Sequence, residues 1–336
     1  MDIINEPAPQ DLTGVIRLTT AAHDEERNTL AGVLPNLHIQ DSVARVSDLV
    51  STQADAAEVR AFDAEAPIGR PAEVTRSVIF DLPPVSQKLR VSEHQQIREG
   101  GASDVIARYA KQVGEAIADR VELFRGEALV TGGLNVNENG AIANVDFGRD
   151  AAATPQVTTS WEDTDATPLT DLLAWSDAYS DLNGVDASQL VISRAAFLKL
   201  VSNAEIVAAA TGATGNGRNK PRVTPQGVTE VLGEYGFSVV VYDRKVKVAG
   251  TVGRVVPEDR VLMLPGDESI GRTVFGTTVE ALEPYYGYNI APEDAPGIVV
   301  GAFRNHDPAG LWVHGNAVAA PVLVNPNLAF APTISA

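Results

Sequence analysis

The sequence contains no cysteine, and this absence excludes several classes of protein. A chain without thiols has no disulfide framework, no thiolate metal site and no cysteine nucleophile. Its stability must therefore come from packing and from assembly with other molecules. The absence of cysteine is also typical of a protein that folds in a reducing compartment.

Long hydrophobic runs are absent as well. No apolar stretch approaches the roughly 18 residues that a helix needs to span a bilayer. The first residues, MDIINEPAPQD, carry acids where a secretory signal would carry lysine or arginine. We therefore expect neither export nor a membrane partner.

Positive charge is scarce: 26 Lys and Arg face 44 Asp and Glu, a formal net charge of −18. Neutralising a phosphate backbone requires clustered cations, so tight or sequence-specific binding of nucleic acid is not expected. A container for DNA would gain from the same excess, because an acidic inner wall repels the duplex and leaves it free to move. Hydrophobic residues make up 44% of the 336 residues and charged residues 21%, as in ordinary globular proteins.

Catalytic motifs are incomplete. The glycines of 212–217 have the spacing of a phosphate-binding loop, but Arg218 stands in place of the lysine and Asn219 in place of the magnesium-binding hydroxyl. A helix-like stretch, AEIVAAA, precedes this loop where a strand is required. We expect a polar loop without bound nucleotide and keep a nucleotide-binding enzyme as an alternative.

Metal-binding patterns are missing too. Among the five histidines, none has a second histidine at the i+3 or i+4 spacing of a helical metal site, and surface or turn positions account for them better. No GxSxG nucleophile motif is present. We expect no catalytic residue, no metal and no cofactor.

Residues 1–39 are expected to form an extended N-terminal arm. Pro7, Pro9 and Pro35 and the charged run at 24–27 suit a segment that lies over a neighbouring molecule better than a core element.

Residues 40–91 are expected to form a long two-stranded hairpin around a tip at 67–71. In its second stretch Val74, Arg76, Val78 and Phe80 share one face of a strand, and neither face is cleanly apolar. A two-stranded hairpin is marginally stable alone in water. We therefore expect it to lie on another subunit.

The clearest helix runs from Ser103, a candidate N-cap, to about residue 130, and Gly132-Gly133 ends it. Apolar residues recur at spacings of three and four, and charged residues occupy the other side. The apolar stripe contains Ile106, Tyr109, Val113, Ile117, Val121, Phe124 and Ala128, and the polar side contains Arg108, Lys111, Glu115, Asp119, Glu122 and Arg125. This pattern predicts a long, half-exposed helix.

The rest of the chain alternates helices and strands, which indicates a compact α+β or α/β unit. Strands are predicted at 141–147, 189–192, 237–243 and 260–265, and helices at 168–183, 193–200 and 228–235. From residue 302 onward we expect short strands, with turns at Gly315-Asn316 and at 325–327. Trp161, Trp175 and Trp312 are expected to fill cores or subunit contacts.

The order of these elements resembles the tailed-phage capsid fold of the Hong Kong type, an α+β fold. Two stretches carry a closer resemblance to the lambda-type major capsid protein E family: the proline-containing strand before the helix, IFDLPPVSQKLRVSEHQQIRE, and the tail FRNHDPAGLWVHGNAVAAPVLVNPN. In the tail, Asp307-Pro308, Pro321 and Pro326 hold the matching places. The resemblance covers nearly the whole chain.

The resemblance implies a division of the chain into named parts. These are an N-terminal arm at 1–39, an extended hairpin called the E-loop at 40–91, a spine helix with the first part of a peripheral P-domain at 92–150, an A-domain at 151–300, and C-terminal strands that return at 301–336. It also implies a non-enzymatic subunit that assembles into hexamers and pentamers of an icosahedral shell around double-stranded DNA.

The implied location is a virion capsid assembled in the host bacterial cytoplasm, with separate scaffolding, portal and decoration proteins. We expect the E-loop and spine to contact neighbouring subunits through Arg60, Arg70, Arg76, Phe80, Lys88, Arg108 and Arg125.

Two features of some relatives are not expected here: a long helical scaffolding segment at the N-terminus, and a covalent cross-link, for which Lys88 is the only lysine in or beside the loop. An encapsulin-like bacterial nanocompartment, which shares the fold and encloses a protein cargo, is the main alternative. A deletion of residues 60 to 80 is expected to leave a folded subunit that cannot assemble.

Overall fold

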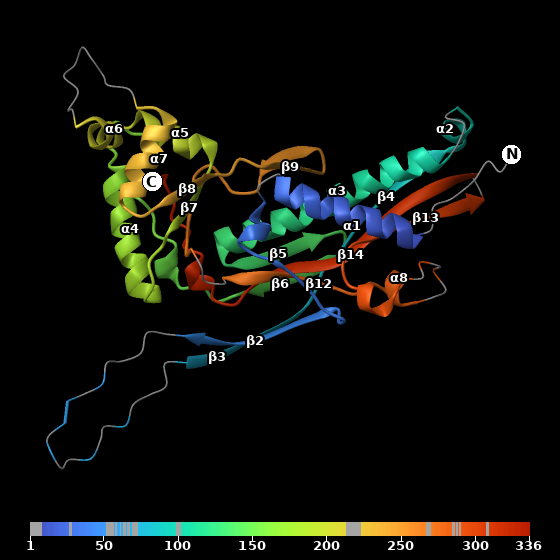
Figure 1. Ribbon diagram of the computed structural model, residues 1–336, viewed down its shortest axis with the longest axis horizontal. Helices are drawn as coiled ribbons and strands as arrows, with labels where there is room; N and C mark the ends of the chain where they lie inside the picture. Colours follow the sequence, from blue (N-terminus) through green and yellow to red (C-terminus); the bar gives the residue numbers. More distant parts are fainter. Residues whose placement is uncertain are drawn as a thin grey trace.

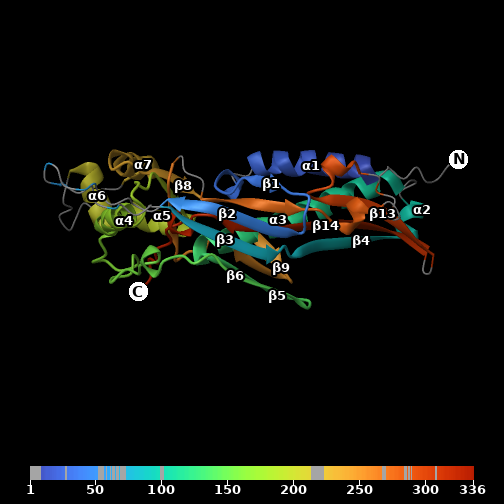
Figure 2. The ribbon, with the colours of Figure 1, turned by 90° about the horizontal axis from the view of Figure 1, so that it is seen from below.

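The computed structural model describes most of the chain. The described ranges are 9–26, 29–51, 73–98, 102–212, 223–266, 270–283, 290–306 and 309–336, together with the single positions 57, 59, 60, 62, 65, 68, 286 and 288. The molecule is elongated and flattened (Figures 1 and 2). A sheet-rich body lies at one end and a helix-rich unit at the other, and a hairpin projects from the side. The helix-rich unit is formed by the middle of the sequence and is called the central unit.

A five-stranded sheet forms the sheet-rich body. Its path is β1-β12-β14-β13, and β4 also pairs with β14. The strands are β1 (Asn36–His38), β4 (Pro84–Ser92), β12 (Gly271–Gly276), β13 (Val299–His306) and β14 (Ala309–Leu323). The β4 segment was expected to be part of the projecting hairpin. It belongs to the sheet instead, because it pairs with β14 over nine positions from Pro84↔Val318 to Ser92↔Gly310.

The long helix α3 (Ala102–Thr131) lies against this sheet and confirms the predicted helix. It begins at Ala102, so Ser103 lies inside it rather than at its cap. Gly132, at φ +75°, ends it as expected in the left-handed conformation that glycine adopts without a steric penalty. Short helix α2 (Glu93–Arg98) precedes it.

The expectation of an extended N-terminal arm is wrong for residues 9–26, which form helix α1 (Pro9–Glu26). Leu12 and Ile16 are buried on one face of this helix, and the hydroxyl of Thr13 both donates to the carbonyl of Val300 and accepts from its N–H, each at 3.1 Å. Pro9 is compatible with this structure because proline is tolerated in the first turn of a helix.

The predicted turn at Gly315-Asn316 is also wrong, because β14 continues through it for 15 residues. Gly315 serves packing instead. A Cβ at this position would lie 2.4 Å from Val113 Cγ1 of α3, so only glycine lets the helix approach the strand this closely.

The central unit confirms the expected alternation of helices and strands. Its three-stranded sheet has the order β11-β7-β8, with β7 and β8 parallel and β11 antiparallel to β7. The elements are α4 (Pro168–Asn183), β7 (Gln189–Ile192), α5 (Arg194–Ser202), α6 (Ala204–Thr211), α7 (Pro225–Glu234), β8 (Ser238–Val241) and β11 (Val261–Leu264). Ser193 caps α5 by accepting a hydrogen bond from the N–H of Ala196.

Three two-stranded hairpins complete the fold: β2 (Val43–Ser51) with β3 (Glu73–Asp81), β5 (Gly133–Glu138) with β6 (Ala141–Asp146), and β9 (Lys245–Val248) with β10 (Thr251–Arg254). Strand β3 confirms the strand predicted at Val74, Arg76, Val78 and Phe80, and its partner in the projecting hairpin is β2; most of the predicted tip lies outside the described residues. Shorter helices are η1 (Leu30–Gly32), η2 (Ala151–Ala153), α8 (Val279–Leu282), η4 (Pro292–Asp294) and η5 (Pro326–Leu328).

The apolar core is divided along α3. The first half of the helix, from Val105 to Val121, packs in one cluster with the sheet and α1. The second half, from Phe124 to Val130, packs in another cluster with the central unit. The half-exposed character predicted for this helix therefore holds only for its first half, because the central unit covers the second half from a further side.

Candidate functional site

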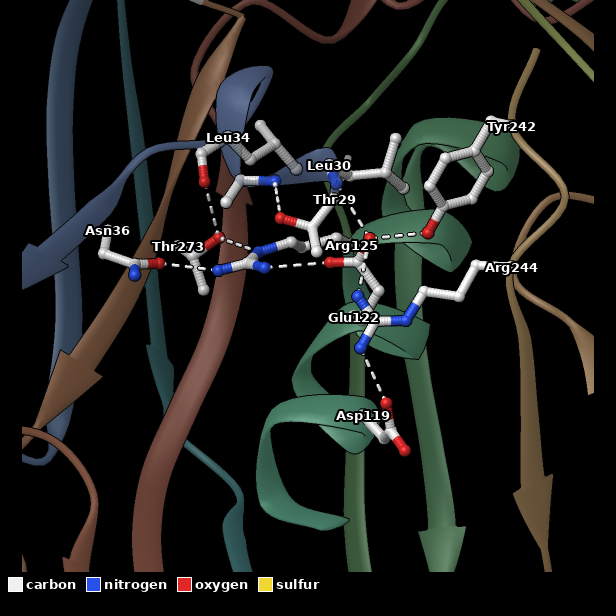
Figure 3. Close-up of polar contacts among 11 residues, drawn as sticks. Thr29, Leu30, Leu34, Asn36, Asp119, Glu122, Arg125, Tyr242, Arg244 and Thr273 are labelled. Atoms are coloured by element: carbon white, nitrogen blue, oxygen red, sulfur yellow. Dashed lines mark hydrogen bonds and ion pairs between the residues drawn. The ribbon is translucent and has the colours of Figure 1, made fainter. Parts of the chain in front are cut away.

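A buried polar network occupies the junction between the two apolar clusters (Figure 3). Its centre is the carboxylate of Glu122 on α3, which is 0% exposed. One carboxylate oxygen, Oε1, accepts from the N–H of Leu30 at 2.8 Å and from the hydroxyl of Tyr242 at 2.5 Å. The other, Oε2, accepts from Nη1 of Arg125 at 2.8 Å. A buried carboxylate is stable only with such donors and a partner charge.

Arg125 extends the network to the sheet and to the segment that leads into it. Its Nε donates to Thr273 Oγ1 at 2.9 Å and its Nη2 to Asn36 Oδ1 at 2.6 Å. The hydroxyl of Thr273 in turn donates to the carbonyl of Leu34 at 2.9 Å. These bonds tie β12 and the 29–36 segment to one side of α3.

On the other side, Arg244 connects the network to the central unit. Its Nη2 lies 2.6 Å from Asp119 Oδ1, and its Nη1 lies 3.9 Å from Glu122 Oε1. Two carboxylates, the buried Glu122 and the partly exposed Asp119, thus balance two guanidinium groups. Burial, reinforced by the negative charge of Glu122, raises the pKa of Tyr242 well above its ordinary value, so its hydroxyl stays protonated and keeps donating.

The network corrects the prediction that Arg125 faces a neighbouring subunit. Its side chain is enclosed within its own chain at 1% exposure, with hydrogen-bond partners from three segments. Arg125 lies four residues after Val121 and three before Ala128, so it is in line with the apolar stripe. That spacing is the signal by which its burial could have been found.

Two other predicted interface residues, Arg60 and Arg108, are exposed. Arg60 lies on the projecting hairpin, and Arg108 lies on α3 with its guanidinium 5.7 Å from the centre of the Tyr109 ring. Arg76 lies in β3, opposite Asp48 of β2. Arg70 and the polar loop at 213–220 fall outside the described residues.

Phe80 anchors the base of the projecting hairpin. It is half-buried and meets Phe147 edge to face, with ring centroids 6.3 Å apart. Farther along the hairpin, beyond the paired strands, Val59 and Phe62 are both 100% exposed. The hairpin therefore contacts its own body at its base, while apolar side chains farther out remain in solvent.

Lys88 lies on β4, on the face of the sheet opposite α3. Its ammonium group is 5.0 Å from the centre of the Trp312 ring on β14, within the range of a cation–π interaction. Trp161 and Trp175, in contrast, stack on each other inside the central unit, as expected for core residues. Lys88 and Trp312 thus form part of a surface, while the other tryptophans stabilise the interior.

The described part of the chain contains no helix that is long and apolar enough to cross a bilayer. Its His, Asp and Glu residues form no group of three or more that could hold a metal ion.

Comparison with known proteins identifies the family. The profile of the family described as phage major capsid protein E matches residues 36–334. A capsid protein of a prophage from E. coli CFT073 has a TM-score of 0.66 at 13% identity, over 98% of this chain and 99% of that one. A phage-related protein from Bordetella bronchiseptica RB50 has a TM-score of 0.57 at 12% identity, over 94% and 96%.

A third solved structure, a virus-like particle from Pyrococcus furiosus, has a TM-score of 0.50 at 11% identity, over 96% of this chain and 99% of that one. Comparison with curated proteins gives no match. At these identities the structural likeness shows the fold alone, whereas the family profile covers most of the chain. The chain therefore belongs to the phage major capsid protein E family, with the tailed-phage capsid fold, and is a structural subunit of a phage head shell.

Proposed function

We propose that copies of this chain form hexameric and pentameric rings that tile an icosahedral shell around packaged double-stranded DNA. In this proposal the shell assembles in the host bacterial cytoplasm with separate scaffolding, portal and decoration proteins, and the subunit catalyses no reaction. The hairpin acts as an E-loop, α3 as a spine, and the central unit as an A-domain.

The projecting hairpin carries the proposal. Its nine-residue strands pair only with each other among the described strands, and isolated pairs of this kind are marginally stable in water. Fully exposed Val59 and Phe62 lie beyond them. Burying apolar surface contributes about 25 cal/mol per Å². An adjacent subunit that covers this hairpin supplies both the support and the burial that the single chain lacks.

A loop replacement tests this role. Residues 52–72 are replaced by Asn-Gly, a two-residue turn suited to joining antiparallel strands. This change keeps β2, β3 and the contact of Phe80 with Phe147. Deleting residues 60 to 80 is less clean, because it would remove most of β3 and Phe80 with it.

We expect the loop-replaced chain to stay folded and to form no closed shells, as judged by thermal unfolding, size-exclusion chromatography and electron microscopy. Phe62→Asp should weaken assembly, whereas Ile142→Asp, at a 78% exposed apolar residue of the β5–β6 hairpin, serves as the matched control. Normal shells from the loop-replaced chain would refute the proposed role of the hairpin.

The content of native particles tests the enclosure of DNA. The acidic net charge of −18 fits a wall that repels the duplex. Particles isolated from producing cells should contain double-stranded DNA that resists added nuclease until the shell is opened. Particles filled with a protein cargo and free of DNA would show that the shell is a nanocompartment.

A further inference from the structure

Strand β13 ends the path of the five-stranded sheet, so one of its edges has no neighbouring strand among the described strands. At Val300 the backbone N–H and C=O both point to this open edge, because both are bonded to a side chain of helix α1 rather than to β14. Backbone groups on one edge of a strand recur at every second residue, so those of Ala302 point the same way. Such a row of groups is a template on which another chain can pair.

Helix α1 lies beside this edge and bonds to it with side chains (Figures 1 and 2). The hydroxyl of Thr13 makes hydrogen bonds to both backbone groups of Val300, each at 3.1 Å. One turn later, Arg17 donates from Nε to the carbonyl of Ile298 at 2.9 Å and from Nη1 to the carbonyl of Asp294 at 2.6 Å. We call Thr13 and Arg17 the edge latch, because they occupy backbone groups that a partner strand would need.

Close packing on α3 holds the latch in reach of the strand. Ile16 of α1 is 2% exposed and lies over Gly114 of α3, where a Cβ would lie 2.3 Å from Ile16 Cγ2. Leu12 is buried in the same apolar cluster as Val300. A side chain at residue 114 would therefore push α1 away from the sheet and take the hydroxyl of Thr13 out of hydrogen-bond distance.

The sequence of α1 makes the helix dependent on this docking. It contains Gly14 and three threonines, which have low helix propensity. Its outer face leaves Val15 57% and Leu18 73% exposed, so only the inner face buries apolar surface. Because most of the stability of a helix in a protein comes from packing of its apolar face, undocking of α1 would melt the helix and uncover the whole edge.

We propose that α1 is an edge cap, which prevents β13 from pairing with the β13 strand of a second copy. Every copy carries the same strand, and a two-fold axis would place the same edge on both sides of such a pair. The edge latch closes this route, so copies meet through other surfaces. The inference goes beyond the proposed shell function and applies to the unassembled subunit.

Hydrogen exchange of the full chain tests the edge latch. Thr13→Val keeps the shape of the side chain but removes its hydroxyl, which leaves the buried backbone groups of Val300 unpaired. Exchange in peptides that contain Val300 should become about ten-fold faster. Thr13→Ser should keep the wild-type rate. Thr19→Val is the matched control, since the hydroxyl of Thr19 donates within its own helix to the carbonyl of Ile16.

Sedimentation velocity tests the edge cap. Ile16→Asp places a charge against α3 and should undock α1, so that the chain self-associates at a concentration about ten-fold lower than wild type, the shift that one or two net hydrogen bonds produce. Val15→Asp, which adds the same charge to the exposed face of α1, is the matched control and should behave as wild type. Adding Ala302→Pro to Ile16→Asp should abolish the extra association, because proline removes an N–H at the open edge and is tolerated on edge strands.

Three results would overturn the proposal. These are wild-type exchange in Thr13→Val, an Ile16→Asp chain that associates no more readily than Val15→Asp, and association that persists after Ala302→Pro. Faster exchange in Thr13→Val, together with association of Ile16→Asp that Ala302→Pro suppresses, supports it. None of these measurements involves the projecting hairpin, so their failure leaves the proposed shell function standing.

Discussion

Substitution of Glu122 by glutamine should destabilise the subunit more than the loss of one hydrogen bond can explain. The carboxylate lies among Arg125, Arg244 and Tyr242 with no exposed surface. Glutamine has nearly the same shape but no charge, so Glu122→Gln leaves the two guanidinium groups with Asp119 as the only carboxylate in the network. Breaking a buried ion pair in this way costs about 3–5 kcal/mol of unfolding free energy.

Two other substitutions set the scale. Tyr242→Phe removes one donor, at 2.5 Å from Glu122 Oε1, and should cost about 1.5–3 kcal/mol, the range for a hydrogen bond to a charged group. Glu258→Gln removes a carboxylate from an ion pair with Arg254 in which the glutamate side chain is 54% exposed. Solvent screens that pair, so the cost should be no more than about 1 kcal/mol.

The measurement is urea unfolding of the unassembled subunit at pH 7, followed by tryptophan fluorescence at a concentration too low for assembly. We expect the loss of unfolding free energy to decrease in the order Glu122→Gln, Tyr242→Phe, Glu258→Gln. A loss for Glu122→Gln no larger than that for Glu258→Gln would refute the reasoning, because the network would then contribute no more than an exposed pair.

Three further predictions concern packing and pH. Gly126→Ala should lower the unfolding free energy by about 1–3 kcal/mol in urea titrations, because its Cβ would lie 2.5 Å from the backbone oxygen of Val255. Phe80→Ala should cost about 1.5–2.5 kcal/mol, roughly half the cost for a fully buried phenylalanine, measured in the same way, and should loosen the hairpin by removing its ring from Phe147. Burial lowers the pKa of His314, so the unfolded chain takes up the proton first: stability should fall as pH decreases through about 6.5, and His314→Gln should flatten that part of a melting-temperature profile.

Each of these has a contradicting outcome. A Gly126→Ala chain as stable as wild type would show that the loop at Val255 moves aside without cost. Unchanged hydrogen exchange in β2 and β3 of Phe80→Ala would show that the hairpin is held by other contacts. If the melting temperature of His314→Gln depends on pH in the same way as that of the wild type, groups other than His314 cause the loss of stability at low pH.

Local sequence signals predicted many of the elements correctly. The three-and-four spacing of apolar residues predicted α3, and the glycine after Asn183 ends α4 in the left-handed conformation at φ 71°. The period-two pattern of Val74, Arg76, Val78 and Phe80 predicted β3. These signals work because helix and strand periods, caps and glycine turns depend on neighbours along the chain.

Other features needed contacts between distant segments. Pro9 lies in the first turn of α1 and locally suggests a non-helical segment. The apolar face of α1 is defined by contacts with β13 and α3, which are distant in the sequence. The local sequence at Gly315 suggests a turn. In the structure this glycine lies within β14 and allows Val113 of α3 to approach the strand closely. The sequence also contains a local hairpin signal at Asn139-Gly140, whose residues both have positive φ and form the two-residue turn of the β5–β6 hairpin.

The sequence by itself determined the family, the long helix, the second strand of the projecting hairpin and the acidic charge of the subunit. Only the tertiary structure decided that Glu122 faces inward, that residues 84–92 join the main sheet, and that Lys88 and Arg90 share a surface with Trp312. The physical reason is that periodicity assigns a residue to one face of its own element. Which faces become covered depends on segments that approach from elsewhere in the chain or from another copy of it.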